Sequence, residues 1–406
     1  MFHLIELTGG NFLSFKDKMT LSMEATGIRE YPDNVYDIGS TKLLKSAVIY
    51  GANSSGKSNL IKAMAFMKDT VMNSSKMNST DKFNTTPFLL NTESREEASY
   101  FELVFFRLGA YYRYGFILDN ERVHAEWFYI IPKGEKKEKQ LFVREEDKIA
   151  ITADFPEGKG LEDKTRGNGL FLVVCDQFNG FISNDVIKGI SDIDILSGID
   201  HDDFDSMTSV YFDSELDRIK EFYRLLNLGF RDIQLAEGDE EYRTKAITTH
   251  SVFDSTGNVV QEELFKLTES ESSGTNKIFD LSGFILFALE FGLTVVIDEL
   301  DAKLHPLLTK SIIQMFHSPE TNQKNAQLIF ATHDTNLLGC DCFRRDQIWF
   351  TEKNAQEQTD LYSLVEFKVR NDRNYEKDYI AGRYGAIPFI GDFTNLMQED
   401  GQESED

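Results

Sequence analysis

Residues 269–301 read ESESSGTNKIFDLSGFILFALEFGLTVVIDELD, and this stretch decides how the chain is organised. It holds two short Ser-Gly sequences, SSGT beginning at Ser272 and LSGF around Ser282. Both precede an apolar run that ends in Asp298-Glu299. Either one could open a helix leading into a buried strand, and the choice determines which serine can face a ligand.

The length of the resulting helix favours SSGT. A helix that begins after Ser282 would span about two turns, roughly 12 Å, before the strand begins. A helix from about Thr275 to Phe291 would be roughly 25 Å long and would include the whole apolar segment. Ser272, Ser273 and Thr275 are good capping residues. This choice places Gly283 mid-helix, at a cost of about 1 kcal/mol relative to Ala unless close packing needs a glycine there. We therefore predict that SSGT opens the helix and that LSGF lies in its interior.

Composition and charge limit the class of protein. The chain has 406 residues, 41% of them hydrophobic, and no uncharged apolar run of the roughly 18 residues that a membrane span needs. The N-terminus lacks the features of a secretory signal. Three cysteines, Cys175, Cys340 and Cys342, indicate a reducing, cytoplasmic setting, and we interpret the close pair as incidental. A net charge of −25 excludes a broad basic surface, so any nucleic-acid contact must be local or supplied by a partner.

Strand and helix patterns alternate at both ends of the chain and predict an α/β fold with a mainly parallel sheet. Aromatic and β-branched runs over 99–131 predict an antiparallel meander near the N-terminus. Helical spacing from about 166 predicts a helical insertion without the long heptads of a coiled coil. We expect four regions: an N-terminal lobe (1–165), a helical insertion (166–245), a C-terminal lobe (246–390) and an acidic tail (391–406), with disorder expected over QEDGQESED at 398–406.

GANSSGKS at 51–58 matches the pattern GxxxxGK[ST] between a predicted strand and a predicted helix. Glycines at the first and sixth positions permit turns that direct backbone N–H groups toward phosphate oxygens. Lys57 would reach the β- and γ-phosphates, and Ser58 would coordinate Mg²⁺. The helix N-terminus adds a favourable potential for the anion. The sequence thus predicts an ATP–Mg²⁺ site made by Gly51, Ala52, Asn53, Ser54, Ser55, Gly56, Lys57, Ser58 and Asn59.

Two further strand ends complete the predicted site. Asp298 ends the apolar strand of the opening stretch, where ligands bind in open α/β sheets, and would hold Mg²⁺. Glu299 is placed to polarise the attacking water as a general base. In QLIFATHD, His333 follows another buried strand, and a neutral imidazole there could contact the γ-phosphate. The predicted catalytic residues are therefore Lys57, Glu299 and His333.

The order of P-loop, Ser-Gly element, Asp-Glu strand and His strand resembles the ABC-type ATPases. The resemblance implies an ABC-type P-loop ATPase fold in which Ser272 and Gly274 bind the γ-phosphate of ATP held by a second copy of the chain. One departure is the Q-loop glutamine that such ATPases carry after the P-loop. The first glutamine here is Gln140, so backbone near Pro87 would have to substitute for it.

SSGT followed by IDELDAKLHP and FATHD looks like the prokaryotic ATPases related to the overcoming-lysogenization (OLD) nucleases and to AbiLi and RloA. NFLSF (11–15), TPFLL (86–90) and GRYGAIPFI (382–390) also resemble that group. The resemblance implies a homodimer or higher oligomer that controls a separate toxin or nuclease in phage defence. We expect no Toprim effector domain after His333. The alternatives are an SMC-like or RecF-like DNA-repair ATPase and a nucleotide-gated scaffold with little turnover.

Overall fold

The computed structural model describes residues 1–198, 208, 211–212, 214–236, 245–367, 373–388 and 391. Of the predicted acidic tail, only Gly391 lies within these ranges. Among the helices of this described part, none is both long and apolar enough to cross a membrane.

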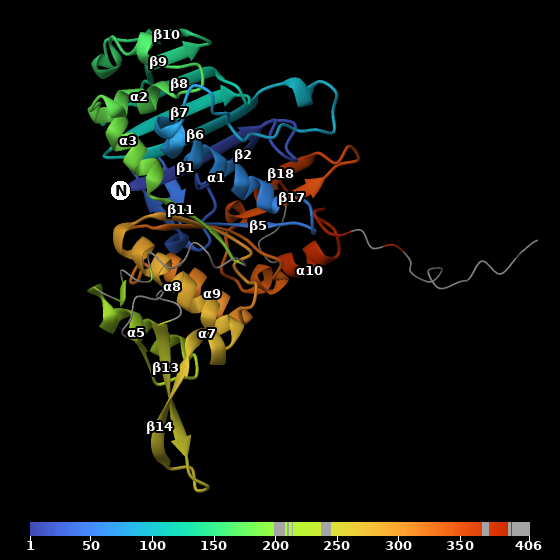
Figure 1. The fold of residues 1–406 in the computed structure, drawn as a ribbon. Coiled ribbons are helices and arrows are strands. Elements are labelled where there is room, and N and C mark those ends of the chain that lie inside the picture. Colours follow the sequence, from blue (N-terminus) through green and yellow to red (C-terminus); the bar gives the residue numbers. More distant parts are fainter. Residues whose placement is uncertain are drawn as a thin grey trace, which may run out of the picture.

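A six-stranded sheet forms the centre of the molecule (Figure 1). Its first five strands are parallel, and β18 joins antiparallel at one edge. The predicted α/β fold with a mainly parallel sheet is therefore confirmed. In spatial order the strands are β11 (Ile193–Ser197), β15 (Thr294–Asp298), β16 (Gln327–Ala331), β5 (Ser46–Tyr50), β17 (Ile348–Lys353) and β18 (Thr359–Ser363).

Both faces of this sheet are buried, which explains why its strands read as unbroken apolar runs. In β5, Ala47 and Ile49 belong to one hydrophobic core, whereas Val48 and Tyr50 belong to the other. Helix α1 (Lys57–Asn73) covers the first face, and α8 (Ser273–Phe291) and α9 (Pro306–His317) cover the second (Figure 1). Because successive side chains of β5 enter different hydrophobic cores, this strand contributes to both cores.

A seven-stranded antiparallel sheet packs over α1 (Figure 1). The predicted meander is confirmed, and its first turn uses Leu108 and Gly109, both with positive φ, as a two-residue hairpin loop requires. Two short strands, β3 (Val35–Asp37) and β4 (Lys42–Leu44), pair with each other as a separate antiparallel ribbon. In spatial order the seven strands are β10 (Lys148–Ile151), β9 (Lys139–Glu145), β8 (Val123–Ile131), β7 (Ala110–Leu118), β6 (Ser99–Arg107), β1 (Phe2–Gly10) and β2 (Met19–Ser22).

The insertion predicted over 166–245 is not purely helical. Its helical patterns are confirmed as α2 (Phe171–Gln177), α3 (Phe181–Ser191) and α5 (Leu216–Leu226). However, β11 pairs parallel with β15 and extends the central sheet. Another strand, β12 (Asp232–Leu235), starts a second small sheet. The expectation of a separate helical body is wrong at β11, because that strand gains both hydrogen bonds and burial from the main sheet.

A long hairpin projects from the body below α8 (Figure 1). It consists of β13 (Ala246–Phe253) and β14 (Val259–Lys266), with β12 beside β13. The short helix α7 (Leu267–Ser270) connects it to α8. At the C-terminal end, α10 (Tyr375–Ile380) packs onto β5 and β17 through Tyr379.

The two close cysteines lie in the segment between η6 (Thr335–Gly339) and β17. Cys340 and Cys342 form a disulfide whose Cα atoms are 5.4 Å apart. Cys175 is buried as a free thiol in α2.

Two buried histidines make the fold sensitive to acid. The His3 ring lies 3.0 Å from the Tyr36 hydroxyl, and the His317 ring lies 2.7 Å from the Ser46 hydroxyl. Burial and the N-terminal ammonium lower the pKa of His3 from 6.5 to about 4. Burial and Lys45 lower the pKa of His317 to about 3.

We expect the free energy of unfolding to fall as the pH drops below 6.5, because the unfolded chain then binds protons that the folded chain excludes. The loss should continue down to about pH 3, the folded pKa of His317. Urea denaturation midpoints measured at several pH values would follow it. His317→Gln should flatten the slope, and an unchanged slope would contradict this assignment.

Candidate nucleotide-binding site

The loop 51–58 joins β5 to α1, as the GxxxxGK[ST] pattern predicts. Ser54 and Gly56 have φ values of 63° and 114°, so the loop turns sharply before the helix begins. A Cβ on Gly51 would lie 2.3 Å from the Ser55 hydroxyl and 2.5 Å from the Thr351 carbonyl oxygen. Glycine is therefore required at Gly51 for the backbone to approach β17 this closely.

Neighbouring segments hold this loop in place. The Thr359 hydroxyl lies 2.9 Å from the Ser55 carbonyl oxygen and 2.8 Å from the Ser14 hydroxyl. The Asn59 side-chain amide donates to the same Ser14 hydroxyl at 2.8 Å. Ser14 belongs to NFLSF, whose Asn11 amide donates to the Ser94 carbonyl at 2.7 Å. The NFLSF motif thus connects the phosphate loop to the antiparallel lobe.

A cavity of about 490 Å³ lies over the loop and the first turn of α1. We call residues 51–58 the phosphate loop and this cavity the phosphate cavity. Lys57 is inside it, and its ammonium donates to the carbonyls of Gly51 at 2.8 Å and Ala52 at 3.1 Å. Burial lowers the pKa of Lys57, and the carboxylates of Asp298, Glu299 and Asp301 oppose this shift. The cavity is lined by Asn53, Ser54, Ser55, Gly56, Lys57, Ser58, Asn59, Glu299, His333 and Lys353.

The Asp298-Glu299 pair follows β15 at the same edge of the sheet. Asp298 Oδ1 is buried and has no hydrogen-bond partner in the described part of the chain. Such an atom is costly unless a cation or a donor meets it, so Asp298 with Ser58 fits Mg²⁺ bound together with phosphate oxygens. The described residues contain no protein-only cluster of three or more metal-ligating groups. A phosphate-assisted magnesium site is the arrangement these side chains allow.

The backbone at Glu299 is held in an unusual conformation. Its φ is 52°, in the left-handed region that non-glycine residues seldom adopt and that often marks functional sites. Gly198 N, at the end of β11, donates to the Asp298 carbonyl at 2.7 Å. A Cβ on Gly198 would lie 2.3 Å from the carbonyl oxygens of both Asp298 and Glu299. Gly198 was not predicted, because no local motif marks it and its partner is far away in sequence.

His333 lies in the same cavity, two residues after β16. Burial and the nearby Lys57 lower its pKa, while Asp301, Glu299 and Asp298 oppose the shift. The imidazole is therefore neutral near pH 7, as the sequence prediction requires. The backbone N–H of His333 faces Asp301 Oδ1 at 3.4 Å.

The helix prediction for the opening stretch is confirmed. Ser272 is the N-cap of α8, and its hydroxyl accepts from the Thr275 N–H at 3.1 Å. LSGF lies in the helix interior, where Ser282 and Gly283 are buried. Among the described residues that line the phosphate cavity, none comes from Ser272–Gly274. The loop and the Ser-Gly element of one chain thus do not share a cavity.

The C-terminal motif lies beside the phosphate loop. A second cavity, of about 660 Å³, shares Ser54, Ser55 and His333 with the first and is also lined by Tyr379 and by 386–388. The Tyr379 hydroxyl donates to the Ala386 carbonyl at 2.9 Å. Lys353 lines both cavities, and neither it nor Tyr379 was predicted from sequence. Gln140 lies in β9 of the antiparallel sheet, and neither Gln140 nor Pro87 is among the described residues that line the phosphate cavity.

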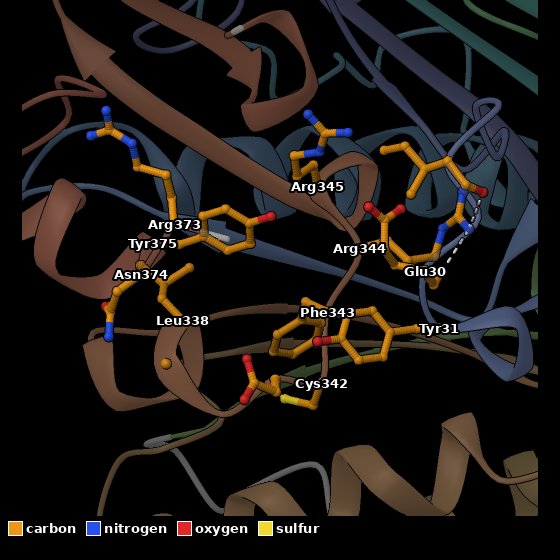
Figure 2. A pocket seen from close by; sticks show the side chains of 13 residues that line it. Glu30, Tyr31, Leu338, Cys342, Phe343, Arg344, Arg345, Arg373, Asn374 and Tyr375 are labelled. Atoms are coloured by element: carbon orange, nitrogen blue, oxygen red, sulfur yellow. Dashed lines mark hydrogen bonds between the residues drawn. The ribbon is translucent and has the colours of Figure 1, made fainter. Parts of the chain in front are cut away.

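A further cavity of about 350 Å³ is lined by residues of the segment that precedes β17, among them Phe343 and Arg345, and by Tyr375 of α10 (Figure 2). Arg344 borders it, but all its side-chain N–H groups are engaged. They donate to both Asp346 oxygens and to the carbonyls of Thr26, Ile28 and Glu30, at 2.7–3.2 Å. Arg344 therefore anchors a loop and is not a ligand-binding group.

A strand–loop–helix with the GxxxxGK[ST] pattern, followed by acidic and histidine strand ends in one cavity, is typical of P-loop ATPases. Residues 46–339 match the family described as "AAA domain, putative AbiEii toxin, Type IV TA system", and the chain belongs to this family of AAA-domain ATPases.

Among solved structures, the SMC head domain from Thermotoga maritima is similar to the chain at 16% sequence identity and a TM-score of 0.42. The similarity covers 89% of this chain and 98% of that chain. No curated protein matches the sequence.

Lys57→Ala should abolish ATP binding, because it removes the cation that faces the phosphates. Titration with a fluorescent ATP analogue in the presence of Mg²⁺ would measure the affinity. Lys62→Ala, an exposed lysine on the same helix, is the matched control and should bind like the wild type. Retained affinity in Lys57→Ala would overturn the assignment of the phosphate loop.

Proposed function

We propose that the chain is an ABC-type ATPase that closes around ATP–Mg²⁺ between two copies of itself and controls a separate effector protein. The observation that carries this proposal is the division of the site. Lys57, Glu299 and His333 line one cavity, whereas the Ser272–Gly274 element of the same chain does not. A second copy is then needed to bring that element to the γ-phosphate.

The residues of the cavity suit hydrolysis. Backbone N–H groups of the loop and Lys57 would bind the phosphates. Ser58 and Asp298 would hold Mg²⁺, which would neutralise the negative charge of the phosphates. Glu299 would polarise the attacking water, and neutral His333 would contact the γ-phosphate. This division of roles places the positive charge at the phosphates and the base at the water.

Ser272 suits the role of a ligand from the second copy. Its hydroxyl and the first N–H groups of α8 lie at a helix N-terminus, where the dipole favours an anion. α8 spans 19 residues and leads directly to β15, so the element is rigidly joined to the strand that carries Asp298. ATP binding would then favour the closed dimer, and hydrolysis would release it.

Resemblance of the sequence to the OLD, AbiLi and RloA group supports control of a toxin or nuclease in prokaryotic phage defence. The GRYGAIPFI motif of that group supplies 386–388 to the cavity beside the phosphate loop. An effector or a second copy that contacts this motif would lie next to the nucleotide.

Two alternatives make different predictions. An SMC-like or RecF-like DNA-repair ATPase would bind duplex DNA tightly, which a net charge of −25 disfavours. A nucleotide-gated scaffold would bind ATP without turnover, and Glu299→Gln would then change no rate. Loss of measurable turnover in Glu299→Gln supports the working enzyme.

Mixing inactive subunits tests the shared site. Ser272→Arg and Lys57→Ala should each be inactive alone, the first because it blocks the element offered to the partner. Heterodimers should regain measurable hydrolysis, at most about half of the wild-type rate per dimer, because only one of their two sites receives an intact loop and an intact Ser272. ATPase assays of the mixture measure this, with each variant alone as the control. No recovery would contradict a site shared between copies.

A further inference from the structure

Lys277 lies on α8 five residues after Ser272 and is almost fully buried, with an exposed fraction of 2%. Its ammonium donates to two backbone carbonyls of the turn that follows β15, those of Glu299 and Ala302, each at 2.8 Å. Burial lowers the pKa of Lys277 to about 8, although the Asp301 and Glu299 carboxylates oppose the shift. A lysine is thus kept in an unfavourable environment to hold a backbone turn.

A second contact joins the same two segments. Gly274, in the first turn of α8, packs against the carbonyl of Lys303, and a Cβ there would lie 2.7 Å from that oxygen. Lys303 has a φ of 63° and Glu299 a φ of 52°, so the turn is bounded by two left-handed residues. The start of α8 and the 299–303 turn therefore touch at two points, and Lys277 supplies the hydrogen bonds.

The 299–303 turn also reaches the histidine strand. Asp301 Oδ1 faces the backbone N–H of His333 at 3.4 Å, and the Leu300 N–H donates to the Ala331 carbonyl at 3.1 Å. One continuous set of contacts therefore runs from the start of α8 through the turn to Glu299 and His333. We place Glu299 at the attacking water and His333 at the γ-phosphate. Displacement of Lys277 would displace the Glu299 backbone with it.

We propose that Lys277 is a positioning residue that fixes the turn carrying Glu299 to the helix carrying Ser272, and so couples the two ATP sites of a dimer. The inference rests on the proposed function, in which Ser272 serves the partner's ATP while Glu299 serves the ATP of its own chain. When the partner's γ-phosphate engages Ser272, Lys277 transmits the position of α8 to Glu299. Hydrolysis at each site would then be faster when the other site is occupied.

The polar partners of Lys277 explain why an apolar residue would not suffice. A methionine of similar length would fill the space but would leave the Ala302 carbonyl without the donor it has now. An arginine would keep the positive charge and the N–H donors. The two substitutions therefore separate the hydrogen bonds of Lys277 from its volume.

Steady-state hydrolysis by Lys277→Met and Lys277→Arg tests the proposal. Lys277→Met should lower kcat about 10- to 100-fold, because a displaced catalytic group costs rate steeply. Its affinity for a fluorescent ATP analogue and its thermal melting should stay near wild type. The Hill coefficient for ATP should exceed unity in the wild type and fall to unity in Lys277→Met. Lys277→Arg should recover most of kcat, and Lys62→Met serves as the control for a lost lysine charge.

ATP-dependent dimerisation in a Glu299→Gln background distinguishes the possible failures. Dimers that form normally, with a Lys277→Met enzyme that is slow and non-cooperative, support the inference. A Lys277→Met enzyme with wild-type kcat and Hill coefficient would overturn the inference alone. A wild-type chain that neither dimerises with ATP nor hydrolyses it would overturn the proposed function and this inference with it.

Discussion

The structure depends on one constraint: three buried parallel strands, β5, β16 and β15, end at the same edge of a sheet that is covered on both faces. Because the strands are parallel, the segments that follow them converge, and Lys57, Glu299 and His333 line one cavity. Charged side chains at such an edge need partners of opposite charge. The lysine there suits phosphate, and the carboxylates suit Mg²⁺. The NFLSF segment connects this edge to the antiparallel lobe, and the C-terminal motif lies beside it.

Much of this arrangement follows from local sequence patterns. The helix at 273–291 could be predicted because only SSGT leaves enough length before β15, and the Ser272 cap confirms it. The meander could be predicted from its turn residues. In each case the deciding signal lies within about twenty residues of the element it predicts.

Other features could not be predicted because their partners are distant in the chain. β11 reads as part of a helical region and becomes a strand only by pairing with β15, about a hundred residues later. Gly198 is required only because the Asp298 backbone approaches it. No local motif marks Lys277, because its partners are carbonyls in the turn after the next strand. A motif names the residues that touch a ligand, but the groups that position them are set by tertiary contacts.

The central claim is that each ATP is held by two chains, and a structure of Glu299→Gln bound to ATP–Mg²⁺ tests it most directly. The account predicts that Ser272 Oγ of one protomer lies within hydrogen-bonding distance, about 3 Å, of a γ-phosphate oxygen held by Lys57 of its partner. A structure in which Ser272 faces solvent, or contacts ATP bound by its own chain, would contradict it.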